Sequence, residues 1–177
     1  AIDGSSLAGA AFEIRASGDI VRPDGSIAAL DGETVATVTT DETGEARADN
    51  LPLGSGTARY EVVETQAPAG FLLDRTTHIV DLTYADQKTP VVEARLNVSD
   101  DYTKVDISKV DASGEQEVEG AQLTLYGPDK TEIDSWTSSD KPHRVEHLVP
   151  GTYSLREMMS PRTYDLAEEI TFEIKDT

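Results

Sequence analysis

The stretch YEVVETQAPAGF, residues 60–71, decides how this chain folds. A degenerate copy, YSLREMMSPRTY, occupies residues 153–164, 93 positions further along. Alternate side chains of a β-strand point to the same face, so Tyr60, Val62 and Glu64 share one face of the first copy. The pattern predicts a strand whose single face carries an aromatic ring, an aliphatic side chain and a carboxylate.

The second copy repeats this face with Tyr153, Leu155 and Glu157. A carboxylate that faces a core is costly, because loss of water disfavours its ionised form and the group must be paired or protonated. A single glutamate of this kind most often meets water where a sheet frays. The pattern occurs twice, each time with a proline four residues after the glutamate, and this indicates that both glutamates face inward.

The first copy resembles the E-box, YxLxETxAPxGY, of the CnaB-type domains found in Gram-positive pilins and wall-anchored adhesins. It departs from that motif only at Val62 and Phe71. The second copy keeps Tyr153, Leu155, Glu157, Pro161 and Tyr164. It has Met158, Ser160 and Thr163 where the family usually has Thr, Ala and Gly.

A second motif of the same family precedes each E-box. Residues 7–14, LAGAAFEI, and residues 118–125, VEGAQLTL, resemble its opening sequence L-x-G-A-x-F-x-L. The resemblance therefore covers nearly the whole chain. It implies two tandem Ig-like, prealbumin-like β-sandwich domains, residues 1–102 without the first, lysine-bearing strand and residues 103–177 without the last strand.

The remaining patterns favour an all-β chain, because alternating apolar runs recur and no helix of ordinary length is signalled. Strands are expected at residues 35–39, 78–84, 90–100, 133–138, 144–148 and 170–174, and from Lys104 onward. In residues 90–100 the even-numbered side chains form the apolar face. The Gly-Ala pairs at residues 9–10 and 120–121 are expected to let strands approach closely.

The first domain has 18 more residues than the second between its Gly-Ala pair and its E-box tyrosine. We place this excess at residues 17–34, where glycines, a proline and aspartates mark successive turns. The segment is interpreted as a surface insertion, with an extra hairpin as one form of it.

Composition excludes several classes of partner. The formal charge is −19, whereas nucleic acid and anionic membranes attract an excess of Lys and Arg. The chain has no cysteine, so neither disulfides nor thiolate metal sites hold the domains together. No apolar run reaches the roughly 18 residues needed to cross a bilayer, and we interpret the chain as a piece of a longer secreted protein.

The family resemblance implies a self-modification in each domain. It identifies Lys109, in the strand region that starts at Lys104, as the amine nucleophile of the second domain and Glu157 as its proton shuttle. In the first domain it identifies Glu64 as the shuttle and Asp100 as the acceptor. Burial favours a neutral amine and a protonated acid, and the amine then attacks the side-chain carbonyl of Asp or Asn. The product is an intramolecular isopeptide bond.

Two parts of this arrangement are not visible in the sequence. The first-domain lysine is expected about three residues before Ala1, and the only lysine up to residue 103 is Lys88, in a polar turn. The second domain lacks an acceptor strand, for which Asp176 is a substitute. We therefore expect neither bond to close within these 177 residues unless another segment completes it.

Other interpretations remain open for three of these side chains. Lys109 has the alternative of extending its ammonium group to the sheet edge. Asp100 has the alternative of opening the turn between the domains. Asn97 is a second candidate acceptor, although its position in the strand points it outward.

The sequence gives no sign of an enzyme. His78, His143 and His147 lie in separate or polar settings, so we expect no metal site and no cofactor. A Ser-His-Asp triad has no elbow motif to support it.

The expected function is a structural stalk of a Gram-positive cell-wall surface protein or pilin, whose partners are neighbouring domains of the same protein. The alternative is an adhesin whose insertion at residues 17–34 binds a host matrix protein or glycan.

Overall fold

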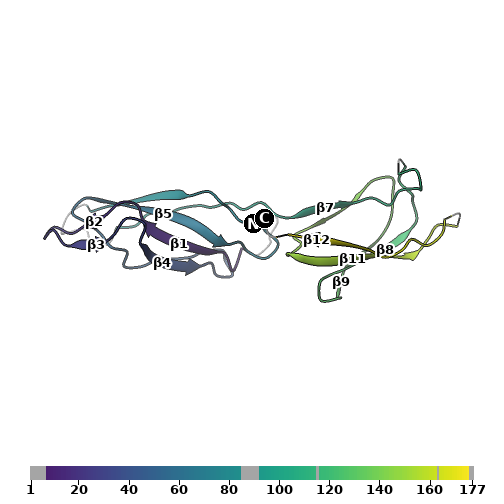
Figure 1. The fold of residues 1–177 in the computed structure, drawn as a ribbon, viewed down its shortest axis with the longest axis horizontal. Helices are drawn as coiled ribbons and strands as arrows, with labels where there is room; N and C mark the ends of the chain where they lie inside the picture. Colours follow the sequence, from purple (N-terminus) through teal and green to yellow (C-terminus); the bar gives the residue numbers. More distant parts are fainter. Residues whose placement is uncertain (1–6, 85–91, 115, 163, 176–177) are drawn as a thin grey trace. The chain divides into compact units, whose positions relative to one another are not determined.

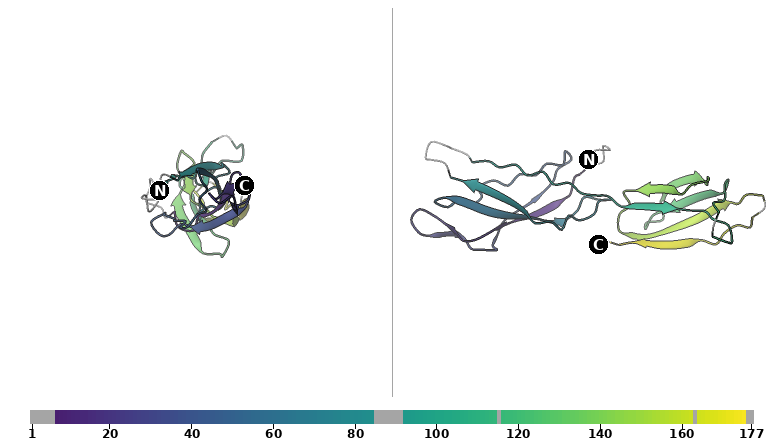
Figure 2. Two further views of the ribbon diagram at one scale, coloured as in Figure 1. Left: turned by 90° about the vertical axis from the view of Figure 1, so that its left-hand side faces the viewer. Right: turned by 90° about the horizontal axis from the view of Figure 1, so that it is seen from above.

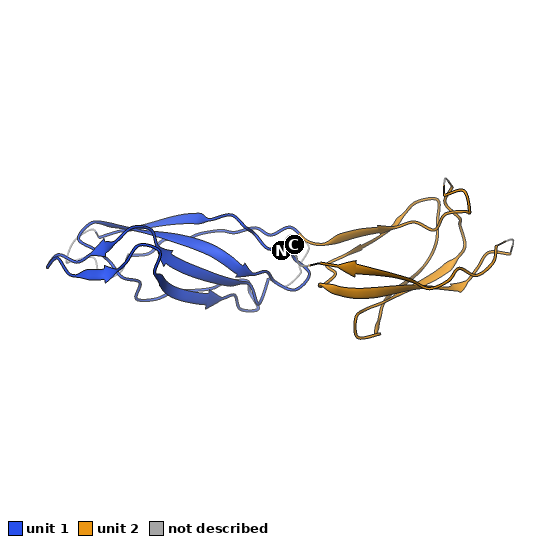
Figure 3. Ribbon diagram, in the orientation of Figure 1, with its two compact units in different colours: residues 1–101 blue, residues 102–177 orange. Residues whose placement is uncertain are grey.

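The structure is a computed structural model that describes residues 7–84, 92–114, 116–162 and 164–175 (Figure 1). The chain divides into two units, Ala1–Asp101 and Tyr102–Thr177 (Figure 3). Every element assigned in the described ranges is a β-strand, which confirms the predicted all-β class. That part of the chain contains no helix with the length and apolar character needed to cross a membrane.

Unit 1 is built on a four-stranded antiparallel sheet in the order β4-β1-β5-β6. The strands are β1 (Ala11–Ala16), β4 (Thr34–Thr39), β5 (Thr57–Gln66) and β6 (His78–Thr83). The central strand β5 carries the first E-box and pairs with both β1 and β6. Figure 2, in the view from above, shows β5 and β6 side by side. The glutamate of this strand pairs with Phe12 of β1 and lies just beyond the part of β5 that pairs with β6.

The predicted insertion is a hairpin of its own. It consists of β2 (Ile20–Val21) and β3 (Ile27–Ala29), which pair only with each other. The hydrogen bonds between β1 and β4 end just before the hairpin begins, where the Ala16 N–H donates to the Glu33 carbonyl oxygen at 2.9 Å. In unit 2 the Gly127 N–H donates to the Thr131 carbonyl oxygen at 2.8 Å in the same way. Ala16 and Glu33 are 17 positions apart, whereas Gly127 and Thr131 are four positions apart. The insertion therefore accounts for 13 of the 18 extra residues of the first domain. The other five lie between β4 and β5.

Unit 2 has a four-stranded sheet, β12-β11-β8-β9, and a two-stranded sheet, β10-β7. The strands are β7 (Lys104–Ile107), β8 (Gln122–Tyr126), β9 (Glu132–Thr137), β10 (His143–Glu146), β11 (Gly151–Met159) and β12 (Ile170–Ile174). Figure 1 shows β7 on the opposite side of this unit from β11 and β12. Side chains from both sheets meet in one core around Leu125, Val145 and Tyr153, as in a two-layer sandwich.

The strand predicted at residues 90–100 is wrong for the described part, because residues 92–100 have no strand assignment. Val92 packs on the unit 1 core, but Ala94 and Leu96 on the expected apolar face are exposed. The segment pairs with no neighbouring strand in the described ranges. Alternation determines which side chains share a face, whereas a strand also needs a partner for its backbone N–H and C=O groups.

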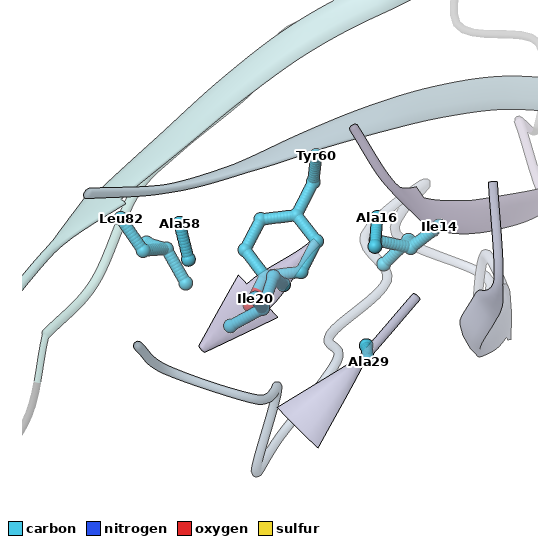
Figure 4. Packing of buried hydrophobic residues seen from close by; sticks show 7 residues of the cluster. All are labelled: Ile14, Ala16, Ile20, Ala29, Ala58, Tyr60 and Leu82. Carbon is cyan, nitrogen blue, oxygen red and sulfur yellow. The ribbon is translucent and has the colours of Figure 1, made fainter. Parts of the chain in front are cut away.

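The two E-box tyrosines are the largest fully buried side chains, together with Leu125. Figure 4 shows the Tyr60 ring projecting from β5 into the unit 1 cluster. Its hydroxyl donates to the Pro52 carbonyl oxygen, and the Tyr153 hydroxyl donates to the Val149 carbonyl oxygen at 2.8 Å. A buried phenol needs such a partner, so each tyrosine fixes a loop as well as filling the core.

The Gly-Ala pairs serve a different purpose from the one predicted. A Cβ atom on Gly9 or Gly120 would meet no heavy atom within 4 Å, so close approach of strands does not require either glycine. Both have positive φ, +89° and +87°, where glycine alone is free of a steric penalty. The tight packing is at the alanines, since Ala10 and Ala121 are almost fully buried.

Candidate functional site

The glutamate and the lysine predicted for unit 2 lie together in its interior. Glu157 is on β11, and Lys109 follows the end of β7 on the opposite sheet. Lys109 Nζ is 3.7 Å from Glu157 Oε2, and the two side chains are 16% and 1% exposed. The structure therefore places an amine and a carboxyl group in contact distance within a buried setting.

Each E-box glutamate is held by the backbone of the chain that returns from the E-box turn. Glu157 Oε2 accepts a hydrogen bond from the Ala167 N–H at 2.6 Å. Glu64 Oε2 accepts one from the Asp74 N–H, also at 2.6 Å. The donor is ten residues after the glutamate in both units. The second oxygen, Oε1, is buried in each case and has no hydrogen-bond partner among the described residues.

A β-bulge follows both glutamates. The register of β5 against β1 shifts directly after Glu64, and that of β11 against β8 shifts directly after Glu157. One extra residue on the E-box strand turns the chain at that point, a feature often found beside functional groups. The two units thus build the same local backbone around the carboxyl group.

The carboxyl groups of unit 1 are strongly affected by their surroundings. The pKa of Glu64 is raised to about 7. Burial is the largest cause, the charges of Asp100 and Asp74 act in the same direction, and the Asp74 N–H and His78 oppose them. Burial also raises the pKa of Asp100, and the charge of Asp74 adds to this. Asp100 Oδ1 is buried without a hydrogen-bond partner among the described residues. The structure therefore brings the predicted shuttle and acceptor of unit 1 together.

The hydrogen-bonded side chains of Asp74 and His78 border this group. Asp74 Oδ2 is 2.7 Å from His78 Nε2, and both side chains are largely buried. Hydrogen bonds from Thr76 and His78 lower the pKa of Asp74 to about 2. Asp74 is therefore a carboxylate at neutral pH, next to a glutamate that is partly protonated.

A cavity of about 250 Å³ opens beside the lysine and glutamate of unit 2. It is lined by Ser108, Lys109, Val110, Leu123, Leu155, Glu157, Ala167, Glu168 and Ile170. Its walls come from the residues that follow β7, from β8 and β11, and from the segment that leads into β12. The space is large enough for a further side chain to reach the amine and the carboxyl group.

The sequence offered three further candidates. Asn97 is exposed, and Lys88 and Asp176 lie outside the described residues. No group of three or more His, Asp or Glu side chains within the described ranges could hold a metal ion. His143 instead pairs with Asp134 at 2.7 Å.

The sequence interpretation missed the backbone donors at Asp74 and Ala167 and the two bulges. The 93-residue offset between the E-boxes also relates Asp74 to Ala167, so the repeat itself held this signal. The role of His78 could not be found in this way, because the residue of unit 2 at the equivalent place in the strand pairing is Ile170.

Comparison with known proteins identifies the fold family. The family model described as SpaA, prealbumin-like fold domain, matches residues 2–96 and again residues 103–177. No curated protein matches the chain.

Solved structures give further matches. The Bacillus anthracis TIE protein is 26% identical with a TM-score of 0.51, over 97% of this chain and 29% of that one. A C-terminal fragment of the pilus adhesin SpaC from Lactobacillus rhamnosus GG is 17% identical with a TM-score of 0.50, over 97% of this chain and 76% of that one. A streptococcal ancillary pilin is 23% identical with a TM-score of 0.36, over 99% of this chain and 56% of that one.

The chain spans less than a third of the Bacillus anthracis protein and about half of the ancillary pilin. The two family matches cover nearly all of its residues, one in each unit. They confirm the resemblance to CnaB-type pilin domains and the two prealbumin-like domains expected from it. The chain belongs to the SpaA prealbumin-like fold domain family.

Proposed function

We propose that the chain is a structural repeat module of a Gram-positive surface protein or pilin, displayed outside the cell at the wall. Its units are stabilised by intramolecular isopeptide bonds between a lysine and an Asp or Asn, promoted by the E-box glutamate. The observation that supports this is the distance of 3.7 Å between Lys109 Nζ and Glu157 Oε2 in a buried site beside a cavity. A bond of this kind resists unfolding by constraining the unfolded chain, where this sequence has no disulfide.

The reaction in unit 2 starts with a proton transfer. The Lys109 ammonium gives a proton to Glu157 and becomes a neutral amine, the form that acts as a nucleophile. The amine nitrogen then attacks the side-chain carbonyl carbon of an Asp or Asn placed in the cavity. A C–N bond forms while the C–O bond of a protonated Asp or the C–N bond of Asn breaks. Glu157 transfers the proton lost by the attacking nitrogen to the leaving group, which departs as water from Asp or as ammonia from Asn. The step occurs once per unit, so the chain modifies itself and does not act as an enzyme.

Unit 1 carries the other half of the same chemistry. Glu64 is the proposed shuttle and Asp100 the proposed acceptor, since each has a buried oxygen atom without a hydrogen-bond partner among the described residues. The repeat places the lysine of this unit before Ala1 in the numbering.

Peptide mapping of the protein recovered from the bacterial wall tests the proposal. A branched peptide is expected in which Lys109 is joined to an Asp or Asn, lighter by one water or one ammonia than its two parts. Glu157→Ala is expected to abolish the branch, and the exposed control Glu132→Ala to keep it. An unmodified Lys109 in the wild-type protein would contradict the proposal. The isolated 177-residue chain is expected to keep its full mass, and a deficit of one water would contradict that expectation.

One observation favours adhesion as a second candidate function. The β2–β3 hairpin exposes three aliphatic side chains, Val21, Ile27 and Leu30. Exposed apolar groups gathered on a short insertion are typical of contact sites. Replacing Val21, Ile27 and Leu30 by serine removes the exposed apolar groups and keeps Ile20 and Ala29, which are part of the unit 1 core. Binding of the chain to matrix proteins or glycans, lost in this variant, would support adhesion, and no binding by either would exclude it.

A further inference from the structure

The two units differ at one position beside the E-box glutamate. In each unit the N–H ten residues after the glutamate donates to its Oε2 atom at 2.6 Å. In unit 2 that residue is Ala167, which has no side-chain donor or acceptor. In unit 1 it is Asp74, whose carboxylate is largely buried and makes further contacts.

The Asp74 carboxylate joins the segment before β6 to the start of that strand. Its Oδ1 atom accepts a hydrogen bond from the Thr76 N–H at 2.8 Å. Its Oδ2 atom is 2.7 Å from Nε2 of His78, the first residue of β6. Both oxygens are therefore used, and together they fix the backbone on either side of the N–H that binds Glu64.

Unit 2 holds the equivalent segment by other means. Arg156 Nε donates to Glu169 Oε2 at 2.9 Å, and the Ser160 hydroxyl donates to the Asp165 carbonyl oxygen at 3.1 Å. These contacts lie on both sides of Ala167 and leave its own side chain out. In unit 1 the equivalent contacts are those of the Asp74 carboxylate with the Thr76 N–H and with His78, which we call the brace. They are made by the same residue that supplies the N–H to Glu64.

We propose that Asp74, braced by His78, is a positioning residue for Glu64: it aims its own N–H at the Glu64 carboxyl group and places a carboxylate beside it. This inference rests on the proposed role of Glu64 as the proton shuttle of unit 1. Asp74 takes no part in bond formation, because its two oxygens are occupied by Thr76 and His78.

The two effects of Asp74 on Glu64 have opposite signs. Its N–H bonds to the Glu64 carboxylate and lowers the pKa of Glu64, whereas its negative charge raises that pKa, and the hydrogen bond is the larger effect. Asp100 and His78 are the other charged groups that act on Glu64. A variant that removes only the charge and one that also removes the brace therefore shift the pKa of Glu64 in opposite directions.

The experiment compares Asp74→Asn with Asp74→Ala in the 177-residue chain. Asn keeps an acceptor for Thr76 and a partner for His78 but loses the charge. The pKa of Glu64 is measured by carboxyl ¹³C NMR, and the protection of the residue 74 amide by hydrogen exchange. Glu157 and the Ala167 amide provide an unchanged reference in the same sample.

Asp74→Asn is expected to lower the pKa of Glu64 and to keep the residue 74 amide protected. Asp74→Ala is expected to raise that pKa by about half a pH unit and to reduce protection about fivefold, the loss of one hydrogen bond. Equal downward shifts in both variants, with unchanged exchange, would overturn the positioning role. If Asp74→Ala prevents unit 1 from folding, His78→Gln decides in its place, and full protection of the amide in that variant would overturn it.

The result is separate from the proposed function. Both readouts are taken on a chain in which no isopeptide bond has formed, so they test the brace alone. If the Asp74 variants behave as expected but the protein from the wall contains no branched peptide, the isopeptide bond is refuted and the positioning role of Asp74 stands. The reverse outcome would refute only the positioning.

Discussion

Glu64→Gln is expected to stabilise unit 1 above neutral pH and to leave its stability almost unchanged in acid. Glu64 is only 3% exposed, and burial raises its pKa from an ordinary value of 4.5 to about 7. The folded state therefore binds the proton more tightly than the unfolded state. Below pH 4.5 both states are protonated, and stability is lost as the pH rises from there through about 7.

The size of the effect follows from the two pKa values. They differ by about 2.5 pH units, and one unit corresponds to about 1.4 kcal/mol, so ionisation of Glu64 costs unit 1 about 3 kcal/mol above pH 7. Glutamine stays neutral and keeps an oxygen that accepts from the Asp74 N–H. Its side-chain amide also offers donors near Asp100, whose charge acts on Glu64. The variant is expected to lose the dependence on pH and keep the packing.

Urea unfolding at about pH 4 and about pH 8 measures this difference. The only tryptophan of the chain, Trp136, lies in unit 2, so its fluorescence follows that unit as an internal reference. Methyl NMR signals of unit 1 follow the other transition. Glu42→Gln, an exposed position in the same unit, is the matched control and is expected to change neither slope nor midpoint.

Two results would refute the reasoning. The first is a Glu64→Gln variant that loses stability with rising pH as steeply as the wild-type chain. The second is a variant that is less stable than wild type at about pH 8, which would mean that the ionised carboxylate stabilises unit 1.

Three further predictions concern unit 2 and are read from Trp136 fluorescence in urea. Tyr153→Phe leaves a loop carbonyl oxygen without its hydrogen bond and is expected to cost about 1 kcal/mol, whereas an unchanged midpoint would show that water replaces the hydroxyl. Gly120→Ala forces a side chain into positive φ and is expected to cost about 1–2 kcal/mol, and a neutral result would contradict the strain. Lys109→Met leaves a buried carboxylate unpaired and is expected to cost about 3 kcal/mol, which adding Glu157→Gln should largely restore; purely additive effects would contradict the pairing.

The faces of the E-box strands could be predicted from the sequence because they depend on alternation alone. Tyr60 and Glu64 are an even number of residues apart, and both are buried. The same holds for Tyr153 and Glu157. Burying a carboxylate is costly, so one strand alone would not have justified an inward-facing glutamate. The second copy of the pattern made that prediction reasonable.

What the sequence did not reveal depends on contacts between distant segments. Residues 92–100 alternate well, but no partner strand pairs with them in the described part of unit 1. The glycines at 9 and 120 are needed for their backbone angles, which composition does not encode. The brace at Asp74 joins residues that neither share one strand nor follow a strand-like alternation, so it could be found only from the folded structure.

The hydrogen bond between Ala16 and Glu33 closes the sheet before the hairpin begins, and unit 2 closes at the same place with three intervening residues. Within the hairpin, Ile20 and Ala29 belong to the core of unit 1, whereas residues 22–26 at its tip are exposed. A peptide tag inserted at this tip would extend the loop and leave both the ladder and the core in place.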